Sequence, residues 1–259
     1  MTSTESSRRK YDQLAERYEE IFFYVADLGQ RLVDFAGPVP GARVLDVGAG
    51  RGAVARAAVA RGCAVTAVDA SAGMVAHLAE DYPGMVVRQL DAAALDFPPG
   101  SFDLVTAGFV VQILDDPAAA LAAMRRVLAP SGMVALSLET QSADRTKWLL
   151  DLTAEFFPGA GASAGPGPMT ADALDTLLTE AGFTGLERTA VDAPRKLPDA
   201  RAVWDWLGPR GLADSVRRLP PERAEQFRAR FLAVAEAERT SDGIVLGFAA
   251  TLHRAHAPH

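Results

Sequence analysis

Short apolar runs alternate with longer amphipathic segments along the middle of the chain, from residue 43 to residue 139. Each apolar run has the length of a strand, as in ARVLDVGAG and AVTAVDAS. A segment with helical spacing of its apolar residues follows each run, as in AVARAAVAR and AGMVAHLAEDY. This alternation is typical of βαβ units, in which right-handed crossovers place helices on both faces of a parallel sheet. We therefore expect an α/β fold with a mostly parallel sheet.

The segments on either side of this core have different patterns. The first part of the chain places aromatic and aliphatic residues at helical spacing, whereas the stretch FFPGAGASAGPGPM is rich in Gly, Ala and Pro and is typical of a loop. We expect a single domain over residues 1–259, made of an N-terminal helical cap (1–38), a ligand-binding core (40–139), a flexible lid-like loop (140–169), a helical insertion (195–241) and a closing strand (243–255).

The composition narrows the choice of partners. A formal net charge of -7 argues against nucleic acid, because proteins that bind a phosphate backbone generally present a basic face. No apolar run approaches the roughly 18 residues of a membrane helix, and no signal-peptide segment follows the N-terminus. We therefore expect no membrane partner and a cytoplasmic location. Cys63 is the only cysteine, and the sequence predicts no metal site. A small-molecule partner is the remaining expectation.

The stretch VLDVGAGRG joins a strand to a helix through a run of glycines. Such a turn places backbone N–H groups at the carboxyl edge of a parallel sheet, where ligands bind. Gly48, Gly50 and Ala53 fit the relaxed dinucleotide fingerprint. Asp69 would then hold a ribose, and this interpretation favours an NAD-dependent oxidoreductase. It leaves Asp46, an acid inside an apolar strand, without a role.

A second interpretation accounts for Asp46. VLDVGAGRG resembles the first motif of class I S-adenosylmethionine (SAM) methyltransferases, in which an acid in the strand supports the loop near the amino group of the cofactor's methionine. Three later segments match the same family in order: VTAVDASAGM, QLDAAALDFPPGSFDLVTAG and VLAPSGMVALS. The resemblance covers residues 40–139 and is to the small-molecule, ubiquinone/menaquinone-type branch (methyltransferase type 11). It implies a Rossmann-like, doubly wound sheet in the strand order 3-2-1-4-5-7-6, with the last strand antiparallel.

The resemblance also implies roles for individual residues. Asp69 would accept hydrogen bonds from both ribose hydroxyls. Met74 would pack against the adenine, Asp91 would accept its amino group, and the Ala92 N–H would donate to a ring nitrogen. Tyrosines of the N-terminal helix reach the cofactor in this branch, although core packing is the alternative for them and for Met74. The implied site for S-adenosyl-L-methionine comprises Tyr11, Tyr18, Asp46, Gly48, Ala49, Gly50, Asp69, Ala70, Met74, Asp91, Ala92 and Gly108.

The chain departs from the family pattern at two places. Ser131 stands where the family usually has glycine, and we expect the adjacent Gly132 to preserve the turn. Gln112 and its neighbours stand after the fourth strand, where the family often shows histidines.

A general base is required only where the acceptor must lose a proton. Glu139, just past the fifth strand, is the first candidate, and His253 is the second. Gln112 cannot act as a base, but it could orient an acceptor through hydrogen bonds. An exposed loop position is the alternative for Glu139, and packing at the end of a strand is the alternative for His253.

These features predict methyl transfer to an oxygen, nitrogen or carbon atom of a small metabolite, achieved mainly by proximity and desolvation. An apolar or aromatic acceptor is favoured, because aromatic residues are concentrated in the segments that would cover the pocket, namely Phe22, Phe23, Trp148, Phe156, Phe157, Trp204 and Trp206. Three alternatives stay open: a SAM-bound cyclase or pericyclase without methyl transfer, an NAD-dependent oxidoreductase, and a non-catalytic binding module.

Overall fold

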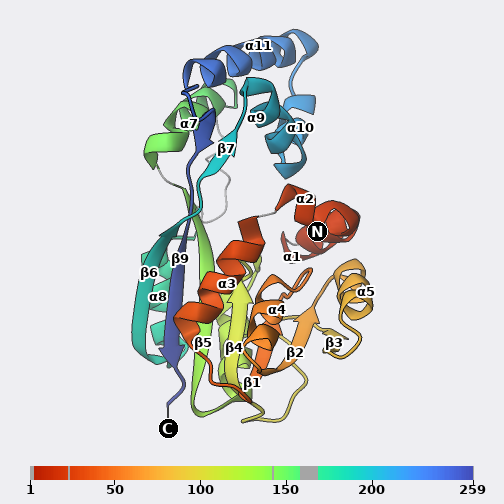
Figure 1. Cartoon of the computed structure of the whole chain (residues 1–259), viewed down its shortest axis with the longest axis vertical. Helices are drawn as coiled ribbons and strands as arrows, with labels where there is room; N and C mark the ends of the chain where they lie inside the picture. The colour runs from red at the N-terminus through yellow and green to blue at the C-terminus, as the bar shows by residue number, and fades with distance from the viewer. Residues whose placement is uncertain (1–2, 23, 142, 158–168, 259) are drawn as a thin grey trace. The chain divides into compact units, whose positions relative to one another are not determined.

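The structure is a computed structural model that describes residues 3–22, 24–141, 143–157 and 169–258 (Figure 1). Phe23 and residues 158–168 of the expected loop lie outside the described residues. The chain forms two compact units where the sequence was expected to form a single domain. The first unit contains residues 1–139, 169–191 and 250–259, and the second contains 140–168 and 192–249.

A seven-stranded sheet dominates the first unit, with the strand order β3-β2-β1-β4-β5-β9-β6. β1 pairs in parallel with β2 and β4, β2 pairs with β3, and β4 pairs with β5. In Figure 1, β9 runs opposite to β4. The predicted strand order and mostly parallel sheet are confirmed, with β9 in the place of the predicted seventh strand. The strands are β1 (Arg43–Val47), β2 (Ala64–Asp69), β3 (Val86–Gln89), β4 (Phe102–Gly108), β5 (Leu128–Gln141), β6 (Thr184–Asp192) and β9 (Phe248–His256).

Helices cover both faces of this sheet, with α3 and α4 in front of it in Figure 1. The strand interiors are mainly apolar, and Leu45, Val105 and Leu136 are completely buried. Side-chain caps fix where helices begin. Ser71 accepts the Met74 N–H at the start of α5, and Asp116 caps α6 before its proline. The helices are α1 (Ser3–Leu14), η1 (Ala15–Arg17), α2 (Tyr18–Ile21), α3 (Tyr24–Ala36), α4 (Ala53–Ala60), α5 (Ala72–Asp81), η2 (Val111–Ile113), α6 (Pro117–Val127) and α8 (Ala171–Glu180).

The described part of the second unit is helical, with one short pair of strands. Its elements are α7 (Ala143–Phe156), β7 (Arg195–Leu197), α9 (Ala200–Leu207), η3 (Gly208–Arg210), α10 (Leu212–Arg217), α11 (Pro221–Ala237) and β8 (Ile244–Leu246). β7 and β8 pair antiparallel, so the expected insertion begins with a strand. The loop expected over 140–169 is wrong over 143–156, where α7 forms. Glycine and proline are concentrated only in the later half of that segment, and the earlier half has no helix breaker.

Aromatic residues build the core of the second unit. The Trp148 and Trp204 rings pack edge-on against Phe231 at 5.5 and 5.1 Å between centroids. Phe156 and Phe157 pack in the same way against Phe227, at 5.2 and 5.1 Å, and Trp206 packs against Phe248. These residues were expected to cover a pocket. Because their partners lie in this core, their concentration in the sequence carries no argument about an acceptor.

The turn before the middle of β5 depends on both Ser131 and Gly132, and Gly132 was expected from the sequence to preserve it. Ser131 itself adopts the left-handed conformation, with φ of 61°. Gly132 is required for space, because a Cβ there would lie 2.9 Å from the Ala129 carbonyl oxygen. The family's glycine position is therefore occupied here by a residue whose side chain opposes the conformation that it adopts.

Replacing Ser131 with glycine should raise the free energy of unfolding by about 0.5–1 kcal/mol. A left-handed L-residue costs about 1–2 kcal/mol, and the greater unfolded-state freedom of glycine offsets part of that gain. Urea unfolding of the wild type, Ser131→Gly and Ser131→Ala would measure the effect. Ser131→Ala keeps the Cβ and should show no gain. A glycine variant less stable than the wild type would contradict this account of the turn.

Candidate functional site

Asp46 lies at the end of β1 and is almost completely buried, with 1% of its surface exposed. Its Oδ2 accepts a hydrogen bond from the Ala55 N–H in the first turn of α4, at 3.0 Å. Its Oδ1 accepts one from the Thr106 hydroxyl of β4, at 2.8 Å. Burial raises the pKa of Asp46 to about 7 in spite of these two donors. The carboxyl group therefore connects two strands to a helix. Burial disfavours its ionised form, and a nearby positive charge would favour that form.

The glycine loop after β1 leaves space for a ligand. Gly48 and Gly50 both adopt positive φ, at 66° and 54°. A Cβ at Gly48 would lie 2.3 Å from the side chain of Val110, so only glycine fits there. A Cβ at Gly50 would meet no atom within 4 Å and would instead project into open space. The loop thus exposes its backbone toward a cavity, as a cofactor cradle requires.

Asp69 connects the glycine loop to the start of α5. Its Oδ2 accepts the Gly50 N–H and its Oδ1 accepts the Ser71 N–H, each at 2.8 Å. Burial raises the pKa of Asp69, and these backbone donors oppose the rise. Each carboxylate oxygen can accept a further hydrogen bond, so the group is suited to a ligand with two adjacent hydroxyls.

A pocket with two lobes lies along the carboxyl edge of the parallel strands. The first lobe has a volume of about 170 Å³ and is lined by Asp46 and by residues of α3 and α4. The second lobe has a volume of about 100 Å³ and is lined by Asp69 and by residues that follow β3. The lobes adjoin, because both are lined by Tyr18, Gly48, Gly50, Gly108 and Phe109.

The structure brings together every residue that the sequence proposed for the cofactor. The first lobe has Asp46 and Ala49, and the two lobes share Tyr18 and the three glycines at 48, 50 and 108. The second lobe has Tyr11, Asp69, Ala70, Met74, Asp91 and Ala92. Asp91 is exposed, and its Oδ1 accepts the Ala93 N–H at 2.8 Å. The individual roles of these residues remain predictions.

The three catalytic candidates lie outside the lining of both lobes. The Glu139 N–H donates to Gln112 Oε1 at 2.8 Å, so Gln112 holds the end of β5 in place. Glu139 is close enough to Tyr18 for its charge to raise the pKa of that phenol. Glu139 is therefore near the junction of the lobes, whereas the Gln112 side-chain oxygen is already occupied.

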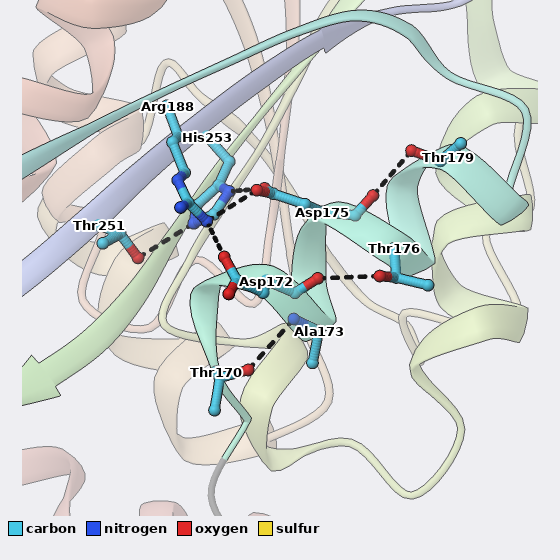
Figure 2. A network of polar contacts seen from close by, with 9 residues as sticks. All are labelled: Thr170, Asp172, Ala173, Asp175, Thr176, Thr179, Arg188, Thr251 and His253. Carbon is cyan, nitrogen blue, oxygen red and sulfur yellow. Dashed lines mark hydrogen bonds and ion pairs between the residues drawn. The ribbon is translucent and has the colours of Figure 1, made fainter.

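His253 belongs to a polar network between β9 and α8 (Figure 2). Its ring is fully buried, with Nδ1 2.7 Å from Asp175 Oδ1 and Nε2 3.0 Å from Thr251 Oγ1. Arg188 pairs with Asp175 and also with Asp172. Both ring nitrogens of His253 therefore have partners on the α8 side of the sheet, and this supports the packing alternative for that residue.

Aromatic residues of the N-terminal segment line both lobes. The Tyr18 ring meets Tyr11 edge-on at 6.1 Å and Phe22 at 4.9 Å between centroids. Burial raises the pKa of Tyr18 far above its ordinary value, so its hydroxyl stays protonated at neutral pH. Tyr18 can thus donate a hydrogen bond but cannot serve as a base.

Sequence reasoning missed several lining residues. Phe109 adopts a left-handed conformation, with φ of 60°, and its N–H is bonded by Ser137 through both the carbonyl and the hydroxyl oxygen. Nothing in the sequence pattern marks a phenylalanine for that conformation. Arg51 lines the first lobe and pairs with Asp81 at 2.6 Å. Its position directly after Gly50 was the one available signal.

Two features are absent from the described residues, a membrane-spanning helix and a metal-binding cluster. No described helix is long and apolar enough to cross a membrane. Among the residues outside the gaps, no group of three or more His, Cys, Asp or Glu side chains could hold a metal ion.

Comparison with known proteins identifies the family. Residues 45–136 match the family described as methyltransferase domain. The chain is 32% identical over 249 residues to nocamycin O-methyltransferase of Saccharothrix syringae, with 86% of this chain and 88% of that protein covered. It is 32% identical over 231 residues to trans-aconitate 2-methyltransferase of Methylobacterium nodulans, with 85% and 87% covered.

Similarity to solved structures supports the same fold. The YcgJ protein of Bacillus subtilis superposes with a TM-score of 0.62 at 19% identity, covering 92% of this chain and 99% of that one. At that identity the likeness shows the fold alone. Membership of the family is shown by the similarity in sequence to the two relatives above. The chain belongs to the class I methyltransferases of the small-molecule branch, whose cofactor is S-adenosylmethionine.

Proposed function

We propose that the chain transfers a methyl group from S-adenosylmethionine to an oxygen atom of a small metabolite with an apolar, ring-containing framework. The class of acceptor is inferred from the apolar side chains that line the first lobe. Phe22, Val25 and Val54 line it, and Phe109 lies where it meets the second lobe. The near full-length similarity to an O-methyltransferase supports oxygen as the acceptor atom.

The placement of the cofactor follows from the charges of the two lobes. We place the amino-acid half on the Asp46 side of the first lobe, where the carboxylate would face the ammonium group, and the acceptor against the apolar wall of the same lobe. We place the adenosine half in the second lobe, where Asp69 would accept the ribose hydroxyls. Met74, which is buried to 1% exposure, and Asp91 are on the adenine side. The open space at Gly50 fits this arrangement, because the cofactor must pass the loop to occupy both lobes.

When bound, the cofactor supplies an electrophilic methyl group on a sulfonium that an acceptor attacks in line. The residues of the chain mainly align the two reactants and exclude water, and such positioning can lower a barrier by about 7–11 kcal/mol. Tyr18 and Phe109 are at the junction of the lobes and would enclose the reacting atoms. The protonated Tyr18 hydroxyl would donate a hydrogen bond to the acceptor oxygen.

Glu139 is the group that we assign to proton removal from a hydroxyl acceptor. It lies inside β5, two residues before the strand ends, and not past the strand as its sequence position suggested. Its backbone N–H is fixed by Gln112. Its charge acts on Tyr18, so it is near the junction of the lobes. A carboxylate there can accept the proton that an attacking hydroxyl releases.

Glu139→Gln should lower kcat for hydroxyl acceptors by about 10²–10⁴-fold, because general-base catalysis contributes an effect of this size. The affinity for S-adenosylhomocysteine should not change. A panel of small phenols and ring-bearing hydroxy acids, incubated with methyl-deuterated cofactor, would reveal products by mass spectrometry. Glu80→Gln, at the exposed end of α5, is the matched control.

The same assay, together with titrations of the protein with SAM and with NAD, separates the competing functions. Deuterated methyl on an acceptor oxygen, with stoichiometric release of S-adenosylhomocysteine, supports the proposal. Product formation without that release would indicate a SAM-bound cyclase. Saturable binding of NAD with no binding of SAM would indicate an oxidoreductase and would overturn the proposal.

A further inference from the structure

Asp12 of α1 contacts the start of α5 through two hydrogen bonds. Its Oδ1 accepts the Ser71 hydroxyl at 2.5 Å and the Gly73 N–H at 3.1 Å. Ser71 is buried, and its hydroxyl oxygen also caps the Met74 N–H. Asp12 is thus bonded to the residue that begins α5, although the two are separated by 59 positions in the sequence.

The same residue, Ser71, connects Asp12 to the ribose side of the pocket. The Ser71 N–H donates to Asp69 Oδ1 at 2.8 Å while its hydroxyl donates to Asp12. A continuous series of hydrogen bonds therefore joins α1 to Asp69. Tyr11, next to Asp12 in the same helix, lines the second lobe together with Asp69.

A second contact holds the N-terminal segment one turn later. Arg51, in the glycine loop, donates from Nη1 to the Ala15 carbonyl oxygen at 3.1 Å, and its Nη2 pairs with Asp81 of α5. The segment from α1 to α2 is therefore joined to the glycine loop by Arg51 and to α5 by Asp12. Only the Asp12 contact reaches a residue that also bonds Asp69.

We propose that Asp12 is a positioning residue for cofactor binding, which holds α1 against the start of α5, places Tyr11 and Tyr18 along the pocket, and orients Asp69 through Ser71. This inference rests on the placement of the adenosine half beside Asp69. It predicts that loss of Asp12 weakens cofactor binding although Asp12 does not line either lobe.

Asp12 also acts on Asp69 through its charge. Its negative charge contributes to raising the pKa of Asp69. Asp69 lies near Asp46 and Tyr18 as well, because its charge contributes to raising the pKa of each. Two further charged residues, Arg8 and Asp91, line the second lobe together with Asp69. The ribose hydroxyls require an ionised Asp69, so binding weakens as the pH falls through the pKa of Asp69. Removing the charge of Asp12 should move that loss to lower pH.

Two substitutions separate the hydrogen bonds from the charge. Asp12→Asn keeps an oxygen that can accept from Ser71 and Gly73 but removes the charge. Asp12→Ala removes both. Glu16→Ala, in the exposed part of η1, removes one negative charge from the same segment without touching α5 and serves as the control.

The probe is 5′-methylthioadenosine, which carries the ribose and adenine but no amino-acid group to face Asp46. Its affinity would be measured by calorimetry between pH 5 and pH 8 for the wild type and the three variants. Asp12→Ala should weaken binding about tenfold at pH 8, because only a fraction of the variant protein would then have α1 and Asp69 in the positions that bind the ligand. Asp12→Asn should bind within a few-fold of the wild type at pH 8 and retain its affinity to lower pH. Glu16→Ala should match the wild type.

Trypsin gives an independent readout of the position of α1, since Arg8, Arg9, Lys10 and Arg17 provide cleavage sites in the segment. Cleavage there should be faster in Asp12→Ala than in the wild type, and saturating S-adenosylhomocysteine should protect the wild type more strongly. Wild-type affinity together with wild-type cleavage in Asp12→Ala would overturn the role of Asp12. Absence of ligand binding by the wild type would instead overturn the cofactor placement itself.

Discussion

Replacing Asp69 with alanine should weaken binding of S-adenosylhomocysteine by about 10²–10³-fold, the largest loss of cofactor affinity that we expect from any single substitution. The carboxylate would accept two ribose hydroxyls, and each hydrogen bond to a charged group contributes about 1.5–3 kcal/mol. The substitution also removes the acceptor for the Gly50 N–H, which shapes the glycine loop. Calorimetry at pH 8 would measure the change in affinity.

The fold should survive this substitution. Asp69 is a carboxylate whose burial raises its pKa, so its removal relieves a desolvation cost while two backbone donors lose their acceptor. The melting temperature should therefore change by only a few degrees. Asp96→Ala, which removes an exposed acid that pairs with Arg88, is the matched control and should bind ligand normally. Asp69→Ala with unchanged affinity would contradict the assignment of the ribose to this residue.

Replacing Asp46 with asparagine should have two effects of opposite sign. At pH 8, S-adenosylhomocysteine should bind about 10- to 100-fold less tightly, because the ammonium group loses a charge-assisted hydrogen bond. The ligand-free protein should become more stable at the same pH, because a buried charge is removed while an acceptor for the Ala55 N–H remains.

The stability of the ligand-free protein should depend on pH, and the sign of this dependence follows from the raised pKa of Asp46. The pKa of Asp46 is about 7 in the folded protein and 3.8 in its ordinary state, so the folded state binds more protons between these values. The wild type therefore loses stability as the pH rises from 4 to 7, by an amount on the order of a few kcal/mol. The asparagine side chain does not titrate, so the free energy of unfolding of Asp46→Asn should increasingly exceed that of the wild type as the pH rises from 4 to 7.

Thermal unfolding of both proteins at several pH values would measure this difference. Asp103→Asn provides a control of opposite sign, because hydrogen bonding from Arg43 lowers the pKa of Asp103. Asp103→Asn should show no gain in stability over the wild type at high pH. If the stability difference between Asp46→Asn and the wild type were independent of pH, Asp46 would have to be ionised at all of these values, and the argument from its burial would fail.

The features that sequence could predict are those that depend on local patterns. The mostly parallel sheet followed from strand-length runs at regular intervals, and the order of its strands was implied by the resemblance of four motifs to the family. The predicted cofactor residues lie at or after the ends of β1 to β4, apart from Tyr11 in α1 and Tyr18 in α2. Because parallel strands present these ends at one edge, residues such as Asp46, Asp69 and Asp91 line one pocket although they are far apart in the sequence.

The features that sequence missed depend on tertiary packing. The left-handed Phe109 is held by Ser137 of the neighbouring strand, a contact that no local pattern encodes. The contact of Asp12 with Ser71 joins two elements across the fold in the same way. The aromatic residues after β5 could have covered a pocket or filled a core, and only the second unit's packing around Phe227 and Phe231 decides between these outcomes. His253 is explained by its partner Asp175 on α8.

The most direct test of the two-lobed cofactor site compares two ligands against two variants. Asp46→Asn and Asp69→Ala would each be titrated with S-adenosylhomocysteine and with 5′-methylthioadenosine, which lacks the amino-acid group. The structure predicts that Asp69→Ala loses affinity for both ligands, whereas Asp46→Asn loses affinity only for S-adenosylhomocysteine. Equal weakening of both ligands by Asp46→Asn, or unchanged binding of 5′-methylthioadenosine by Asp69→Ala, would contradict the placement of the two halves of the cofactor.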